Sequence, residues 1–341
     1  VCPPASSKEI SDVIRFITRR LAVMVGLLFS VTIITFLLFN ALPSDPAALT
    51  CGKSCTPEII EKNRVRLGYD KPIAEQYALF LKGIVAGREY GSGSATFECE
   101  APCLGYSFRK GEEVTTLIVR ALPATIALTS GAFVLWIVVG LGVGIISALK
   151  KGKWQDRLGI SFVLVGTSLP TFFTGLLLVF AFVFWVPIFP TPRYIELGED
   201  PLFWFLTMLL PWVTLALLYS AIYARLSRDG ILETMNEDYI RTARAKGLGE
   251  GVVVRRHVLR SALTPIVTIA GIDLAGLLGG AIVTEAVFSI PGLGRLTFSA
   301  VHESDLPVLA GTIMLTSSFI IVANTLVDIA YARLDPRVGV Q

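Results

Sequence analysis

A polar, basic stretch interrupts the apolar second half of the chain and reads Asn236-Glu-Asp-Tyr-Ile-Arg-Thr-Ala-Arg-Ala-Lys-Gly-Leu-Gly-Glu250. Just before it, Thr234-Met-Asn-Glu237 has the form of a capping box, in which a hydroxyl and a carboxylate satisfy free amide groups at a helix start. Gly247 follows good helix formers and stands where helices commonly end in a left-handed residue. The stretch therefore predicts a short helix, a glycine turn and a second short helix.

A unit of this size cannot bury a core of its own, so we expect it to dock on another surface. Its cations favour an acidic or polar groove, and they are Arg241, Arg244, Lys246, Arg255 and Arg256. The alternative is a solvated loop held near lipid head groups.

The rest of the chain is far more apolar than a soluble domain requires, because 53% of its 341 residues are hydrophobic and only 17% are charged. Several runs reach the about 20 residues that cross a bilayer as a helix. They are Leu21–Leu42, Ala124–Leu149, Leu158–Val186, Leu202–Tyr223, Ala262–Val287 and Leu306–Ala332. We expect an all-α polytopic membrane protein with six transmembrane helices.

The distribution of Lys and Arg assigns the two sides of the membrane. The N-terminal segment, the loop after the second run, the stretch 225–260 and the C-terminal tail hold eighteen of them, against two in the opposite short loops, Arg193 and Arg295. Under the positive-inside rule this places both termini and the basic stretch in the cytoplasm.

Three parts follow from this assignment: a cytoplasmic N-terminus with the first transmembrane helix (1–42), an extracytoplasmic loop domain (43–120), and a core with five transmembrane helices (121–341) that carries the cytoplasmic loop 227–260. Within the loop domain, helices are predicted over Thr56–Leu67 and Ile73–Val85. Gly52-Lys53-Ser54 does not complete a phosphate-binding loop, because Ala47 stands where that motif needs glycine.

Glycines in the second and fifth runs have spacings that let helix backbones approach closely. They are Gly140, Gly142, Gly144, Gly271, Gly276, Gly279 and Gly280. Prolines can break or bend the third, fourth and fifth runs at Pro170, Pro211 and Pro265.

Few ionisable residues lie within the apolar runs, and an intramembrane carboxylate indicates a functional site by default. Asp273 and Glu285 in the fifth run are candidates for lining a water-filled pathway, with a bundle hydrogen bond as the alternative for Asp273. Asp328, near the inner end of the sixth run, is expected to form a structural pair instead.

Catalysis and metal binding find no support in the sequence. The histidines are His257 and His302, on opposite sides of the membrane, so no His-based triad or HExxH zinc site can form. We expect a protein that is not an enzyme, with no cofactor, metal or nucleic acid bound by this chain.

Four cysteines lie in the expected extracytoplasmic loop, an oxidising space where disulfides persist: Cys51, Cys55, Cys99 and Cys103. We expect two disulfides. Pairing within each Cys-x3-Cys element is favoured by proximity and crossed pairing by stability, and a tetrathiolate zinc site is a third option.

The basic stretch resembles the ATPase-coupling loop of inner-membrane permeases of ABC importers, in the form found in the first permease of the dipeptide/oligopeptide subfamily. The resemblance rests on 238–248 and 256–265 and extends to 42–46, 66–72, 104–108, 122–125, 279–294 and 328–337. The chain departs from the general Glu-Ala-Ala pattern of that loop, with Arg241-Thr242-Ala243 at the triplet, and the two Cys-x3-Cys elements are not part of the subfamily pattern.

The resemblance implies a type I importer permease fold in the bacterial plasma (inner) membrane. It implies a second, homologous permease, two cytoplasmic ATPase subunits that bind ATP and magnesium, and an extracytoplasmic binding protein that delivers di- or oligopeptides. The residues expected to couple to the ATPases are Glu237, Asp238, Tyr239, Arg241, Thr242, Ala243, Arg244, Ala245, Lys246, Gly247, His257 and Leu259.

Two alternatives stay open. The same ABC importer architecture carries nickel chelates, glutathione and other small solutes. An ion-coupled secondary transporter is the second alternative, although it would need an ion site between repeated halves, and the sequence offers only Asp273 near a midplane.

Overall fold

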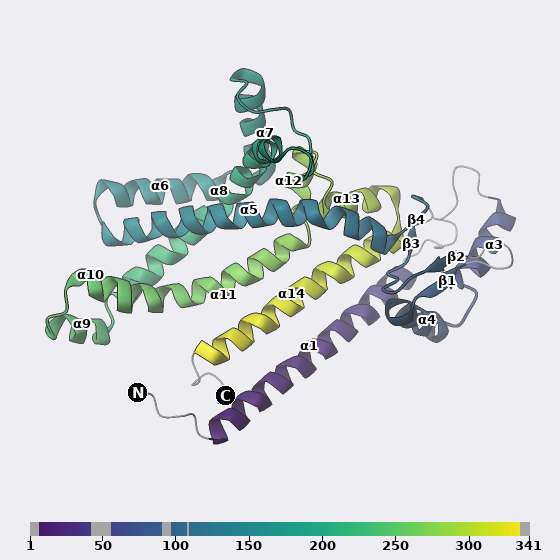
Figure 1. The fold of residues 1–341 in the computed structure, drawn as a ribbon, viewed down its shortest axis with the longest axis horizontal. Helices are drawn as coiled ribbons and strands as arrows, with labels where there is room; N and C mark the ends of the chain where they lie inside the picture. The colour runs from purple at the N-terminus through teal and green to yellow at the C-terminus, as the bar shows by residue number, and fades with distance from the viewer. Residues whose placement is uncertain (1–6, 42–55, 91–96, 108, 335–341) are drawn as a thin grey trace. The chain divides into compact units, whose positions relative to one another are not determined.

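We describe a computed structural model of the chain over residues 7–41, 56–90, 97–107 and 109–334 (Figure 1). In this part of the chain, five helices are long and apolar enough to cross a membrane, and a bent pair of shorter helices brings the number to six if it counts as one span. The predicted all-α polytopic fold is therefore confirmed. The segment 88–113 adds two short β pairings that the sequence analysis did not predict.

The chain divides into two compact units, described separately here. Unit 1 holds residues up to Pro123, Leu278–Gly280 and the part from Gly292 onward, and unit 2 holds Ala124–Leu277 with Ala281–Pro291.

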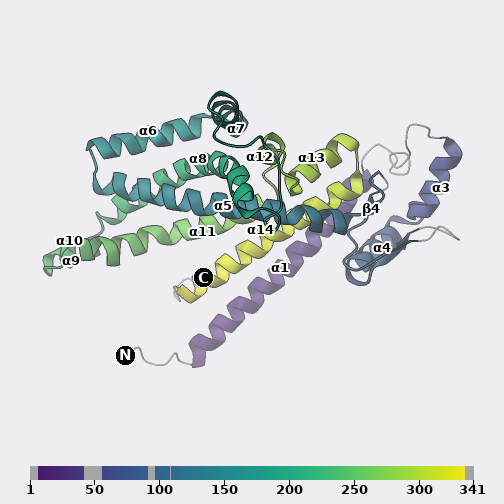
Figure 2. The same cartoon turned by 45° about the horizontal axis from the view of Figure 1, so that its top comes forward.

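In unit 1, the long helix α1 (Ser7–Ala41) runs beside α14 (Leu306–Leu334), as Figures 1 and 2 both show. Two helices precede the β pairings, α3 (Pro57–Leu67) and α4 (Ile73–Ala86), and both confirm the predicted ranges. Tyr77 of α4 packs its ring against Phe36 of α1 at 5.2 Å, and its hydroxyl lies 2.8 Å from that of Thr32. The loop segment is thus attached to the first helix by both apolar and polar contacts.

The β pairings of unit 1 are antiparallel. Strand β1 (Arg88–Tyr90) pairs with β2 (Phe97–Cys99), with Arg88 opposite Cys99, and β3 (Tyr106–Ser107) pairs with β4 (Glu112–Glu113). The hydroxyl of Ser107 donates to the carboxylate of Asp305, which is buried. This bond ties the second pairing to the turn between α13 (Leu293–Glu303) and α14.

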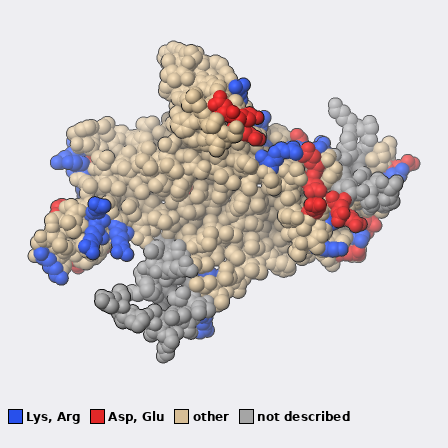
Figure 3. Space-filling view, in the orientation of Figure 1, with Lys and Arg blue, Asp and Glu red and all other residues tan. Residues whose placement is uncertain are grey.

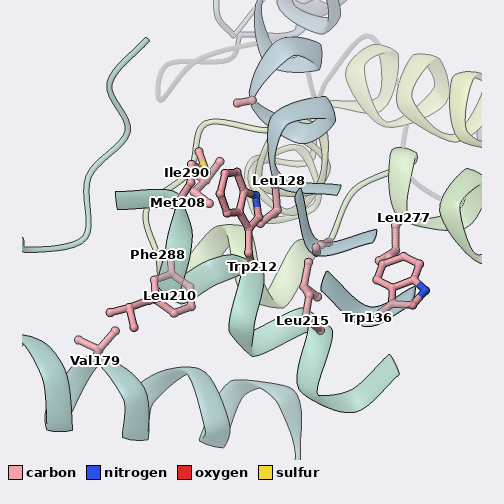
Figure 4. Close-up of a cluster of buried hydrophobic side chains, with 14 of the residues drawn as sticks. Leu128, Trp136, Val179, Met208, Leu210, Trp212, Leu215, Leu277, Phe288 and Ile290 are labelled. Carbon is pink, nitrogen blue, oxygen red and sulfur yellow. The ribbon is translucent and has the colours of Figure 1, made fainter. Parts of the chain in front are cut away.

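In unit 2, helix α5 (Val114–Leu149, from Ala124) and α6 (Trp154–Ser168) form a hairpin, and α6 packs along α8 (Pro201–Thr234). The core contains Trp136, Trp212 and Phe288, which come from α5, α8 and the segment after α12 (Ile282–Val287) (Figure 4). The Trp212 indole N–H donates to the Ala127 carbonyl at 2.9 Å. A large aromatic core therefore holds α5 and α8 together, and the Trp212 indole nitrogen within it has a hydrogen-bond partner.

Glycines permit the closest helix contacts in unit 2. A Cβ at Gly144 would lie 1.8 Å from the Ser227 Oγ of α8, and one at Gly140 would lie 2.8 Å from Tyr223 Cβ. The packing prediction is confirmed for these two. It is wrong for Gly142 and Gly276, which have nothing within 4 Å of such a Cβ, because they point to other faces of their helices.

The third apolar run is not one straight helix. It is divided into α6 and α7 (Thr171–Val179), which continues as the π-helical segment η2 (Phe180–Trp185), and the two parts are bent by 100°. The break lies at Leu169 and Pro170, both extended, because proline disfavours the helical conformation at the residue before it. The break predicted at Pro170 is confirmed, whereas Pro211 and Pro265 lie inside continuous helices.

The fifth run also ends earlier than predicted. Helix α11 (Leu259–Leu278) stops before Gly280, whose φ of 117° is available to glycine alone at low cost, and the remainder of the run forms the separate helix α12. A Cβ at Gly280 would also lie 2.3 Å from the Gly294 amide nitrogen, so the break depends on a close backbone approach within unit 1.

Candidate functional site

The basic stretch forms a compact element at one end of unit 2. Helix α9 (Asp238–Ala245) follows α8 after a three-residue turn, and Gly247 adopts the predicted left-handed conformation with φ 78°. The capping box is wrong: Thr234 is the last residue of α8 and its hydroxyl donates back to the Gly230 carbonyl at 2.8 Å. Glu237 occupies the N-cap position and makes no side-chain capping bond.

The second short helix is wrong as a separate element. Residues Glu250–Val253 (α10) continue through the π-helical turn Val254–Val258 (η3) into α11, so the glycine turn leads directly into a membrane-spanning helix of 29 residues. His257 and Leu259 lie half-buried on either side of the buried Val258. The element therefore connects the C-terminal end of α8 to the N-terminal end of the helix that contains α11.

Apolar side chains fix α9 to the bundle. Ile240 is fully buried and Ala243 nearly so, and both pack in one cluster with Ala148 of α5, Ile231 of α8 and Val253 of α10. The element has no core of its own, as predicted, and shares one with three membrane helices. Burying a residue such as Ile240 stabilises this contact by about 2 kcal/mol.

The opposite face of α9 is exposed and polar. Arg244 bridges to α10, since its Nε and Nη2 donate to the two carboxylate oxygens of Glu250 at 3.0 and 2.7 Å. This bond raises the pKa of the Arg244 guanidinium. The remaining exposed side chains are Glu237, Asp238, Tyr239, Arg241, Thr242, Ala245 and Lys246.

Basic side chains gather at the end of unit 2 that carries α9 and α10 (Figure 3). An open depression adjoins α9 there, lined by Gly249, Glu250, Gly251, Val252, Arg255 and Arg256. We refer to the exposed face of α9 together with this depression as the docking surface. It offers a partner an exposed ring at Tyr239 (46% exposed), an apolar patch at Val252 (48%) and a rim of cations.

A buried ion pair lies close to the docking surface, and the sequence analysis missed it. Asp156, at the start of α6, is 4% exposed and accepts from Arg228 of α8 through both oxygens, at 2.8 and 3.1 Å. It also accepts from the Ser147 hydroxyl at 2.5 Å and from the Gly152 amide at 2.9 Å. The sequence does contain a signal for this pair, because Asp156 is the one carboxylate among the cations of the loop after the second apolar run.

The pair connects three elements. Arg228 lies in α8, the helix whose last residue, Thr234, comes just before α9. Ser147 and Asp156 belong to the α5–α6 hairpin. Because every lone pair direction of the carboxylate is used by a donor, its burial is compensated, and loss of one partner would leave a buried charge.

Asp273 lies in α11, half-buried, and accepts a hydrogen bond from the Tyr223 hydroxyl of α8 at 2.6 Å. Tyr219, one turn earlier in α8, stacks on Trp136 with ring centroids 4.6 Å apart. The structure thus brings one carboxylate and three aromatic rings together inside unit 2.

Glu285 has a different environment. It is fully buried, and one of its oxygens accepts from the Thr125 hydroxyl at 2.9 Å. The two carboxylates that the sequence grouped as pathway candidates therefore differ in access to solvent. The side chain of Asp328 lies outside the described residues.

In the loop segment, Cys99 and Cys103 form a disulfide. Local pairing is confirmed for this Cys-x3-Cys element, and crossed pairing or zinc ligation by these two residues is wrong, because the tight turn at 99–103 holds them against each other. Cys51 and Cys55 lie outside the described residues, as do the stretch 42–46 and the last residues of 328–337.

Comparison with known proteins decides the family. The profile of the binding-protein-dependent transport system inner membrane component matches residues 140–340, and the N-terminal profile of such membrane components matches residues 13–129. The chain belongs to this permease family. It is a multi-pass inner-membrane permease subunit of an ABC importer, with the type I permease fold that the resemblance implied. The family works with ATPase and substrate-binding partners.

Relatives of nearly the same length agree. A Brucella abortus (strain 2308) protein with a provisional name as a peptide transport system permease is 37% identical over 94% of this chain and 98% of its own. The dipeptide transport system permease protein DppB of Alkalihalophilus pseudofirmus is 34% identical over 94% and 98%. The glutathione transport system permease protein GsiC of Pectobacterium atrosepticum is 36% identical over 95% and 99%.

Two solved structures also resemble the chain. One is an amino acid ABC transporter with histidines, at 17% identity over 65% of this chain and 94% of that chain, with a TM-score of 0.48. The other is the methionine ABC transporter MetNI in inward-facing conformations, at 21% identity over 67% and 98%, with a TM-score of 0.45.

Proposed function

We propose that this chain is one of two permease subunits of an ATP-driven importer of di- and oligopeptides. The observation that carries the proposal is the docking surface, an exposed, basic helix whose buried face is shared with three membrane helices. Relatives named for peptide and dipeptide transport, matched over at least 94% of this chain, support the cargo.

The docking surface would receive a cytoplasmic ATPase. Asp238, Tyr239, Arg241 and Lys246 present exposed contacts, while Ile240 and Ala243 fix the helix to the bundle. A movement of the ATPase on ATP binding would then pass to α8 and α11, because α9 is joined to one by a short turn and to the other through Gly247. In this proposal ATP and magnesium bind to the two ATPase partners, and this chain is not an enzyme.

The docking surface requires a defined orientation. With α9 in the cytoplasm, both termini lie there too, as the eighteen Lys and Arg on that side support. The segment 43–120 then faces the outside, where the substrate-binding protein would deliver its peptide. Part of that segment is linked by the Cys99–Cys103 disulfide, which suits an oxidising space.

Reconstitution tests the proposal. The permease pair, its ATPases and the binding protein are placed in lipid vesicles, and uptake of labelled di-, tri- and pentapeptides is compared with uptake of glutathione and nickel. We expect ATP-dependent uptake of peptides. ATP-dependent uptake of a non-peptide solute alone would refute the cargo, and uptake without the ATPases would refute the mechanism.

A further inference from the structure

The carboxylate of Asp273 has an unusual environment for a membrane-spanning helix. Tyr223 donates to its Oδ2 at 2.6 Å, and Asp273 is in no ion pair with a Lys, Arg or His of the described residues. Its side chain is half-buried, whereas that of Glu285 is completely buried. Asp273 thus combines a fixed position with an accessible face.

The tyrosine that holds this carboxylate belongs to a group of aromatic rings in unit 2. Tyr223 is fully buried and holds Oδ2, and Trp136 lies 6.3 Å from its ring and stacks on the half-buried Tyr219 at 4.6 Å. The Trp136 indole nitrogen is buried and has no hydrogen-bond partner. Of these rings only the half-buried Tyr219 leaves part of its surface accessible, and it lies close enough to Asp273 to feel the charge of the carboxylate. A carboxylate beside an accessible aromatic ring is an arrangement that proteins use to hold an organic ammonium ion, because the ion is attracted by both the charge and the ring.

An ionised carboxylate within a membrane span carries a large cost unless it is paired or reaches water. A transported peptide brings a cation that can pair with this carboxylate, since every unblocked peptide carries an α-ammonium whatever its side chains. This includes glutathione, for which one relative is named.

We propose that Asp273, positioned by Tyr223, binds the α-ammonium group of the peptide during its passage. The inference rests on the proposed function and adds the group of the substrate that is recognised. A site for the ammonium fixes one end of the peptide and leaves its side chains unselected, which suits a carrier of peptides of varied sequence.

The test compares a tripeptide with its deamino analogue, in which hydrogen replaces the ammonium. Uptake is measured in the reconstituted complex with the binding protein saturated by each compound, so that its own preference is removed. Asp273→Asn removes the charge and keeps an oxygen for the Tyr223 hydroxyl. Asp273→Glu keeps the charge, and Glu233→Gln is the control at an exposed carboxylate of α8.

We expect wild type to prefer the free tripeptide. Asp273→Asn should lower its uptake at least about tenfold, the loss of one charge-assisted hydrogen bond, and leave uptake of the analogue unchanged. Asp273→Glu should retain most of the preference, and Glu233→Gln all of it. Equal wild-type uptake of both compounds, or an equal loss on both in Asp273→Asn, would overturn the inference. No uptake of any peptide by wild type would instead contradict the proposed function.

Discussion

The contact between α5 and α8 leads to a sharp prediction at Gly144. In Gly144→Ala, the new methyl group would lie 1.8 Å from the Ser227 Oγ and 2.6 Å from the Ala224 carbonyl oxygen. The hydroxyl can rotate away, but the backbone oxygen cannot move without separating the helices. Gly142→Ala is the matched control, because it lies on the same helix two residues earlier and its methyl group would meet nothing within 4 Å.

The magnitude follows from these contacts. Overpacking of a close helix contact costs about 1–3 kcal/mol, so Gly144→Ala should lower the free energy of unfolding by about 2 kcal/mol. Gly142→Ala should change it by less than about 1 kcal/mol, and in the stabilising direction, since alanine is the better helix former.

Unfolding can be followed by SDS titration of the purified chain in mixed micelles. Trp136 of α5 and Trp212 of α8 are both buried, so their fluorescence reports separation of these helices. Equal shifts of the unfolding midpoint in the two variants, or a shift at Gly144→Ala of less than about 0.5 kcal/mol, would refute the assigned contact.

Three further predictions concern other parts of the chain. Gly247→Val, at φ 78°, should cost about 1–2 kcal/mol locally and abolish ATP-coupled uptake with normal membrane insertion. Gly142→Val, in open space within helix α5, should preserve uptake, and normal uptake in Gly247→Val would contradict this. Asp156→Ala should destabilise the chain by about 3 kcal/mol, because it leaves the guanidinium of Arg228, only 20% exposed, with the exposed Asp229 at 3.4 Å as its remaining carboxylate. A loss no larger than that of an exposed carboxylate, Glu233→Ala, would count against the buried pair. Non-reducing peptide mapping should recover Cys99 linked to Cys103, and two alkylatable thiols in protein from its native membrane would exclude the bond. Cys99→Ser should lower the local stability of the loop by about 2 kcal/mol.

The docking surface shows how far local sequence patterns reach. A short helix ahead of Gly247 and the left-handed conformation of that glycine were predicted correctly, because helix propensity and the conformational freedom of Gly247 are properties of a few neighbouring residues. The capping box failed at the same place. Thr234 has the right type and spacing, yet it is held in the last turn of α8, whose length is set by packing of its buried face.

The sequence by itself determined that the chain is a membrane protein with several apolar spans, and where the short helices of the loop lie. These features depend on hydropathy and on spacing along the chain. Only the tertiary structure decided which glycines face a neighbouring helix, that Asp156 pairs with Arg228 across 72 residues, and that Asp273 meets Tyr223 across 50. Those contacts depend on the rotation of one helix relative to another, which side-chain packing sets and which no periodicity within a single helix contains.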